Sequence, residues 1–186
     1  MMRELRDEEK EFLVNYCMES DKNIWLALAI GQLQPELKTA IVFSFLKKLD
    51  KSVERELKER GLHCQWDTRI PKINLEVQDD CIYMVTMKDP EIEIHLIREK
   101  NNLFVGTPAA NGTCPQAEDL ASFFEDTDLD LETHDYWRWW FYPEPSHKSF
   151  ESLSTLHDGE LRCNKIAYFT DMLVRPAEAI SKVLGA

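Results

Sequence analysis

The densest group of candidate metal ligands in the sequence is the acidic run Asp126-Thr127-Asp128-Leu129-Asp130-Leu131-Glu132. Its carboxylates alternate as the first ligands of a calcium-binding loop do. Such a loop needs glycine at its sixth position and glutamate at its twelfth, where this sequence has Leu131 and Trp137. We therefore predict no metal here, and we interpret the run as an acidic loop that is solvated or that contacts a basic partner.

A second candidate centre combines Asp80 with Glu93 and His95, which lie on neighbouring predicted strands. In metal-dependent nucleases, an acidic residue and a Glu-x-Lys strand hold Mg²⁺ and the attacking water. Here His95 stands where the lysine is expected, and Asp79-Asp80 is explained more simply as a turn. Catalysis by these three residues stays an alternative, and we predict no catalytic residue and no cofactor.

Other motifs of enzyme chemistry do not occur in the sequence. The five cysteines are widely spaced and form no Cys-x-x-Cys pair, which argues against a zinc site or a disulfide framework. The five histidines are scattered, and there is no Gly-x-Ser-x-Gly, phosphate-binding loop or dinucleotide-binding glycine motif. Acyl transfer and nucleotide hydrolysis therefore have no motif in their favour.

The net charge of −12 is concentrated in one part of the chain. Residues 1–72 hold thirteen basic and thirteen acidic side chains, whereas residues 73–186 hold nine and twenty-one. Glu118 to Asp135 contains eight acidic residues and no lysine or arginine. Because affinity for nucleic acid comes largely from lysine and arginine on phosphates, we expect no direct nucleic-acid binding and a partner with a basic surface.

The sequence shows no segment that could enter a membrane. Its longest apolar run covers residues 24–30, far short of the ~20 residues that span a bilayer. The first residues lead directly into acidic ones and contain no apolar core of a signal peptide. We expect a cytoplasmic protein with no membrane contact.

Helical periodicity appears at both ends of the chain. Helices are predicted over residues 7–19, over 22–33, and from Pro35 to just before Gly61, where apolar residues recur every fourth position. A short helix is predicted near 116–124, and a long final helix begins near Asp158. Because proline removes a backbone hydrogen bond, Pro176 predicts a kink or break near Val174.

Between Gly61 and the loop at 106–115 the apolar period changes to two. Four strands joined by short turns are predicted, over residues 73–77, 81–87, 92–96 and 103–105. The fold class is α+β, with N-terminal helices and a long C-terminal helix packed on an antiparallel four-stranded meander. We expect one domain, 1–186, with a helical part (1–61), the meander (62–106) and an acidic, aromatic segment with the final helix (107–186).

The aromatic segment Tyr136-Trp137-Arg138-Trp139-Trp140-Phe141-Tyr142 holds six of the nineteen aromatic residues. Each such side chain can bury roughly 150–250 Å². We therefore expect this segment to cross between the helices and the sheet, either as core or as a partly exposed binding surface.

Two regions of the chain resemble a known family. Residues 21–60, with Asn23-Ile24-Trp25-Leu26-Ala27-Leu28-Ala29 and Pro35-Glu36-Leu37-Lys38, resemble the region after the catalytic core in phage and bacterial PD-(D/E)XK nuclease-superfamily proteins. The aromatic segment, Pro143-Glu144-Pro145, Leu156-His157-Asp158-Gly159 and the final helix are similar to the end of the same proteins. The family's catalytic residues would precede residue 1, so the resemblance implies the non-catalytic half and assigns no catalytic residue.

These patterns predict a non-enzymatic protein, accessory or inhibitory, that binds another protein. One specific form is an antagonist whose carboxylates take the place of phosphates in the basic channel of a DNA- or RNA-processing protein. A metal-dependent nuclease or nuclease subunit and a homo-oligomer joined through the aromatic segment remain alternatives. The predicted partner-binding residues are acidic or aromatic and lie in the C-terminal half: Asp126, Asp128, Asp130, Glu132, Asp135, Trp137 and Trp140.

Overall fold

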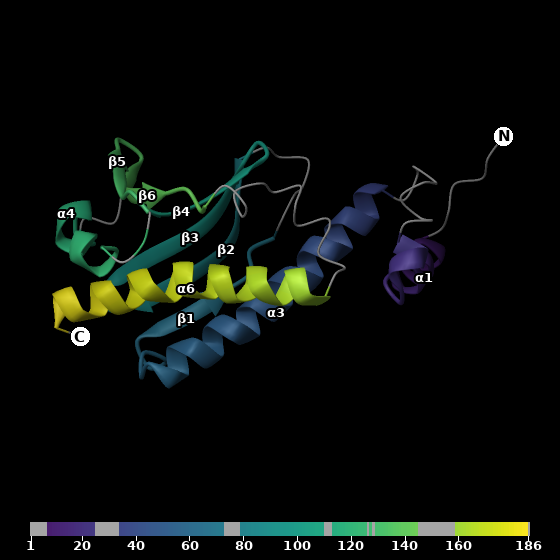
Figure 1. Cartoon of the computed structure of the whole chain (residues 1–186), viewed down its shortest axis with the longest axis horizontal. Coiled ribbons are helices and arrows are strands. Elements are labelled where there is room, and N and C mark those ends of the chain that lie inside the picture. The colour runs from purple at the N-terminus through teal and green to yellow at the C-terminus, as the bar shows by residue number, and fades with distance from the viewer. Residues whose placement is uncertain are drawn as a thin grey trace.

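The computed structural model describes residues 7–24, 34–72, 79–109, 113–125, 127, 129–144 and 159–185. Figure 1 shows how the elements follow one another along the chain. The helices are α1 (Asp7–Cys17), α3 (Gln34–Glu59), α4 (Ala117–Leu120), the 3-10 turn η1 (Ala121–Phe123) and α6 (Gly159–Leu184). The strands are β1 (Trp66–Arg69), β2 (Asp79–Lys88), β3 (Glu91–Glu99), β4 (Asn102–Pro108), β5 (Glu132–His134) and β6 (Trp137–Phe141).

The fold class is α+β, as predicted, but in the described residues the sheet has six strands instead of four. Their order is β1-β2-β3-β4-β6-β5, and every neighbouring pair is antiparallel. The prediction missed β1 because four residues are too few to show an alternation. It missed β5 and β6 because their aromatic and acidic residues do not alternate between apolar and polar. The predicted strand at 73–77 lies outside the described residues.

The N-terminal helices are confirmed in the described residues, but not all of them pack on the sheet. Helix α3 covers the predicted range, and Gly61 beyond its end has φ 76°, a conformation that glycine adopts without strain. At the start of α3, Leu37 and Ile41 form a small separate buried cluster with Cys17 of α1 and with Ile24, which follows α1 in the chain. Of the predicted helix at 22–33, residues 25–33 lie outside the described part.

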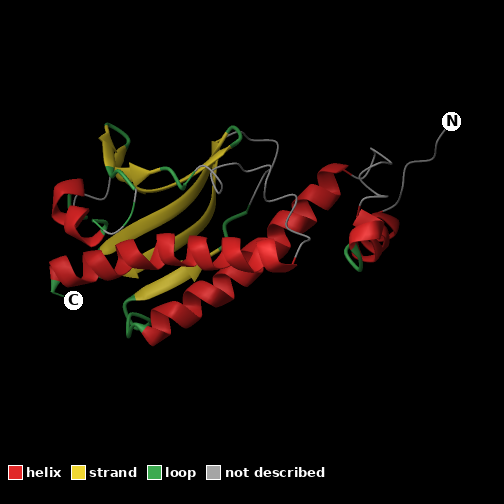
Figure 2. Ribbon diagram, in the orientation of Figure 1, coloured by secondary structure: helices red, strands yellow, loops and turns green. Residues whose placement is uncertain are grey.

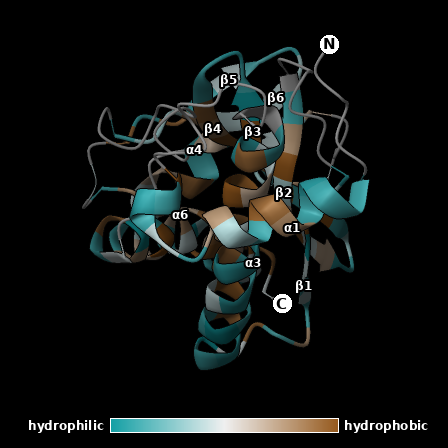
Figure 3. Ribbon diagram, turned by 90° about the vertical axis from the view of Figure 1, so that its right-hand side faces the viewer, coloured by the Kyte–Doolittle hydropathy of each residue, from teal (hydrophilic) through white to brown (hydrophobic). Residues whose placement is uncertain are grey.

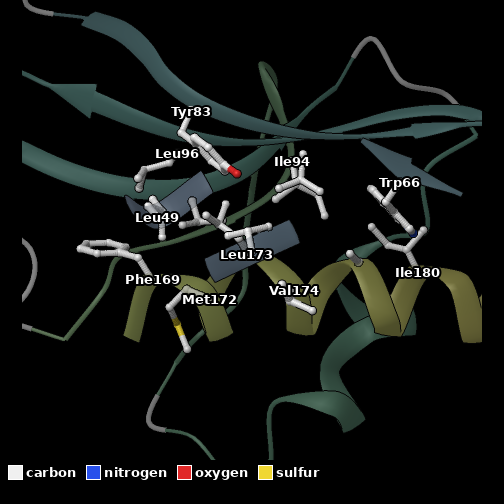
Figure 4. Close-up of a cluster of buried hydrophobic side chains, with 14 of the residues drawn as sticks. Leu49, Trp66, Tyr83, Ile94, Leu96, Phe169, Met172, Leu173, Val174 and Ile180 are labelled. Atoms are coloured by element: carbon white, nitrogen blue, oxygen red, sulfur yellow. The ribbon is translucent and has the colours of Figure 1, made fainter. Parts of the chain in front are cut away.

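Helices α3 and α6 pack against the same face of the sheet, as the ribbons in Figure 2 show. Leu49 of α3, Ile94 of β3 and Leu173 of α6 belong to one buried cluster, drawn in Figure 4. Hydrophobic residues concentrate in the sheet, whereas much of α3 is hydrophilic (Figure 3). A buried hydrogen bond from Trp66 Nε1 to Ser181 Oγ, 2.9 Å long, also ties β1 to α6.

Of the predicted kink or break near Val174, the break is wrong, because α6 continues through Pro176 to Leu184. Pro176 cannot donate its backbone hydrogen bond, which weakens the helix locally. The residues around it are buried against the rest of the core, among them Leu173, Val174 and Ala177. Because tertiary packing supplies most of the stability of a helix in a protein, this burial compensates for the missing bond.

A network of ion pairs joins the end of α3 to α6. Arg60 contacts Glu56 Oε1 at 3.0 Å, Asp171 Oδ1 at 3.3 Å and Glu178 Oε2 at 2.7 Å. Lys182 Nζ contacts the other oxygen of Glu178 at 2.6 Å. Hydrogen bonds from Lys182 and then Arg60 lower the pKa of Glu178, against the opposing effect of burial. The ionised form of Glu178 therefore stabilises the packing of α3 against α6.

This network predicts a loss of stability in acid. Because the pKa of Glu178 is lower in the folded than in the unfolded chain, its contribution is present above the unfolded pKa, about 4.3, and disappears as the pH falls through the folded value. We expect the free energy of unfolding in urea to fall less steeply between about pH 5 and pH 3 in Glu178→Gln than in the wild type. Glu11→Gln, a change of an exposed glutamate of α1, should keep the wild-type slope. Equal slopes in Glu178→Gln and the wild type would contradict this assignment.

Candidate functional site

The face of the sheet that points away from α3 and α6 has an aromatic surface. Successive side chains of a strand point to opposite faces. On β3 and β4, Leu96 and Val105 enter the main core, whereas Ile97 and Phe104 lie outside that cluster and pair across the two strands. We call the second side the outer face. Its aromatic residues come from β4, β6 and the position after β6: Phe104, Trp137, Trp140 and Tyr142.

Phe104 is the centre of this aromatic cluster. Its ring centroid lies 5.2 Å from that of Trp137, 5.8 Å from that of Trp140 and 6.3 Å from that of Tyr142, with edge-to-face angles between 75° and 87°. Trp140 and Tyr142 are themselves 4.9 Å apart at 87°. Edge-to-face pairs add about 0.5–1.5 kcal/mol beyond the area they bury. The rings therefore hold one another in place while Trp137, Trp140 and Tyr142 stay half-exposed.

Gly106 makes room for this arrangement. A Cβ atom at this position would lie 2.9 Å from Trp140 Cβ, 3.0 Å from the Trp139 carbonyl oxygen and 3.1 Å from Trp137 Cε3. Two of these neighbours are fixed by the backbone of β6, so they cannot move aside cheaply. A glycine inside a strand often marks such a close approach.

Carboxylates surround the aromatic cluster. Glu132 of β5 is opposite Trp140 in the register, so it lies on the outer face. Tyr142 donates a hydrogen bond to Glu99 Oε2 over 3.4 Å. Burial, followed by the charges of Glu99 and Glu132, raises the pKa of Tyr142. The tyrosine therefore lies in a negative local field, which would favour a cationic group of a partner.

Glu93 and His95 adjoin the cluster on β3. His95 Nε2 is 2.8 Å from Glu93 Oε2, and the His95 ring meets Trp137 edge-on at 6.3 Å. Their alternation on the strand places both on the outer face with Ile97. The acidic rim, which we define as Glu93, Glu99 and Glu132, thus extends over β3 and β5.

The aromatic segment divides between the two faces. Trp139 and Phe141 are fully buried members of the main core, whereas Trp137 and Trp140 lie on the outer face. Trp139 and Phe141 are therefore core, as one of the two alternatives expected, whereas Trp137 and Trp140 are partly exposed and their use in binding stays a prediction. The expected course of the segment between helices and sheet is wrong, because the segment is a strand of the sheet itself.

The predicted acidic contacts fall in and around the β5–β6 hairpin. Asp130, Glu132 and Asp135 are exposed, as an interaction surface requires. Asp126 and Asp128 lie outside the described residues. Phe104 and Tyr142 are not among the predicted partner-binding residues. Only the pairing of β4 with β6 brings Phe104 to Trp137 and Trp140, whereas Tyr142 is two residues after Trp140 and so lies beside it along the same strand direction.

The structure brings together only part of the alternative nuclease centre. Glu93 and His95 are in contact, but Asp80 is opposite Arg98 on β3, five residues from Glu93 along that strand. Five residues of a strand span about 16 Å. Within the described ranges, no group of three or more histidine, cysteine or acidic side chains could hold a metal ion.

Comparison of the chain with protein-family models, with curated proteins and with solved structures gives no match. In the described part of the chain, every helix is too short or too polar to cross a bilayer. The candidate site therefore rests on its own geometry, which is an aromatic sheet face with an acidic rim.

The close packing around Gly106 predicts that adding one methyl group at this position lowers the stability of the protein. Gly106→Ala should destabilise the protein by about 1–3 kcal/mol, because the new Cβ forces the Trp137 ring and β6 to shift. The midpoint of unfolding in urea, followed by tryptophan fluorescence, measures this change.

Gly159→Ala is the matched control, because a Cβ there meets no atom within 4 Å. The control should unfold within about 0.5 kcal/mol of the wild type. If Gly106→Ala were as stable as this control, the close packing of Trp137 over Gly106 would be refuted.

Proposed function

We propose that this chain is a non-enzymatic cytoplasmic protein that binds a basic surface of another protein through its outer face and acidic rim. The observation that supports the proposal most directly is the aromatic cluster of half-exposed Trp137, Trp140 and Tyr142 beside Glu99 and Glu132. Half-buried aromatic side chains surrounded by polar groups are a common form of interaction hot spot.

The chemistry of this surface favours arginine and lysine. A guanidinium or ammonium group over the face of a tryptophan or tyrosine gains about 0.5–2 kcal/mol, depending on how far it is desolvated. Glu132, opposite Trp140, can pair with the same cation. An aromatic face and a carboxylate would thus hold one basic side chain between them, and the negative charge of the region would speed its approach.

Direct binding of nucleic acid fits this surface less well. Half-exposed aromatic rings on an antiparallel sheet can stack on bases, and that mode requires cations for the phosphates. Glu93, Glu99 and Glu132 bring carboxylates to this face. The register also places Arg69 and Lys88 there, on β1 and β2, and Lys88 is paired with Asp67. A protein that presents carboxylates in this way is suited to occupy the basic channel of a nucleic-acid-processing partner in place of the nucleic acid.

The proposal predicts selective binding of basic peptides. An arginine-rich peptide should bind the wild-type protein at low salt, measured by calorimetry, whereas a glutamate-rich peptide and a single-stranded oligonucleotide should not. Glu132→Lys should lower the affinity for the arginine-rich peptide on the order of tenfold, and this difference in affinity should become smaller as salt is added. Glu11→Lys changes the net charge equally on α1 and should leave the affinity within about twofold.

Three results would contradict the proposal. Equal loss of affinity in Glu132→Lys and Glu11→Lys would show that only net charge matters. Tight binding of the oligonucleotide would favour a nucleic-acid surface instead. Cleavage of plasmid DNA in Mg²⁺ that is abolished by Glu93→Ala would support the nuclease alternative.

A further inference from the structure

In the described part of the chain, strand β5 lies at one edge of the sheet. It ends the strand order, and among the described residues only β6 pairs with it. Glu132, Thr133 and His134 are all exposed. The outer side of such a strand presents backbone N–H and C=O groups that an extended peptide of another protein can pair with.

A hollow of about 470 Å³ lies beside this edge. Its apolar lining comes from α4, η1 and the chain leading into β5: Ala117, Ala121, Phe124, Leu129 and Leu131. Its acidic lining consists of Glu118, Glu125 and Asp130, and the described lining includes no lysine or arginine. The described lining therefore combines apolar walls with negative charge and contributes no basic side chain of its own.

The two sides of β5 differ in a way that sets the pattern of a bound strand. Leu131 and Thr133 line the hollow, whereas Glu132 lies opposite Trp140 on the outer face. Side chains of an added strand would alternate between the same two sides. Adjacent residues of the peptide would thus meet the hollow and the outer face in turn.

We propose, building on the function proposed above, that the basic partner binds as an extended segment added to β5. One lysine or arginine lays its methylene stem on the apolar lining of the hollow and brings its cation to Glu118, Glu125 and Asp130. The next basic residue lies on the outer face beside Glu132 and Trp140. Long basic side chains commonly bury the stem and leave the charged end at polar groups.

The charges on both sides of β5 favour a basic segment over an acidic or a purely apolar one. An acidic or phosphate-bearing segment would place negative groups against carboxylates on both sides of β5, and like charges at an interface are strongly unfavourable. A purely apolar strand would leave Glu118, Glu125, Asp130 and Glu132 without cationic partners. A segment with two adjacent basic residues satisfies both sides at once.

The test uses a capped hexapeptide, Val-Thr-Arg-Lys-Thr-Val, and two derivatives that are methylated on the backbone nitrogens of alternate residues. All three have the same charge, but each derivative lacks the N–H donors on one edge of the peptide. Binding to the full chain is measured by calorimetry. Hydrogen exchange of the amides in residues 131–135 is measured with and without each peptide.

Strand addition predicts that one derivative binds at least tenfold more weakly than the parent peptide while the other binds like it. The parent peptide should slow exchange in residues 131–135. The double variant Glu125→Gln/Asp130→Asn should lower the affinity for the parent peptide about fivefold or more, whereas Glu11→Gln should leave this affinity unchanged.

Two failures can be told apart. If the parent peptide binds and Glu132→Lys weakens it, but both derivatives bind alike and the double variant has no effect, strand addition is wrong and the proposed function stands. If neither this peptide nor the arginine-rich peptide binds, both proposals are wrong.

Discussion

The rest of this structure depends on one constraint, which is that α3 and α6 occupy only one face of a six-stranded antiparallel sheet. Because strand residues alternate, burying Trp139 and Phe141 under the helices forces Trp140 and Tyr142 to the opposite side. Strand β6 is therefore apolar on both faces although only one of its faces belongs to the main core. It gives the sheet an outer face on which aromatic rings pack mainly against one another.

The sequence was sufficient for the parts of the fold in which a single period repeats over many residues. The four-residue spacing in α3 and the alternation in β3 were confirmed, since such patterns reflect one buried stripe or face. The strands β1, β5 and β6 were missed, because β1 is only four residues long and the residues of β5 and β6 do not alternate between apolar and polar. The predicted break at Pro176 was also wrong, because a local helix penalty is visible in the sequence and the compensating tertiary burial is not.

The sequence also predicted part of the candidate site. Composition identified Glu132, Asp135, Trp137 and Trp140, since charge and aromatic density are visible without a fold. Phe104 could not be identified, because only the register between β4 and β6 makes it the centre of the aromatic cluster. The register also decides against the nuclease alternative, because it separates Asp80 from Glu93 and His95. Two side chains on neighbouring strands become one site only if the register aligns them.

The central claim is that the outer face, rather than the helical side, receives a basic partner. The most direct measurement follows the indole N–H signals of the tryptophans by nuclear magnetic resonance while an arginine-rich peptide is added. The account predicts that the signals of Trp137 and Trp140 shift in a saturable way, while those of the buried Trp66 and Trp139 stay in place. Shifts confined to Trp66 and Trp139, or no shift in any tryptophan at saturating peptide, would contradict it.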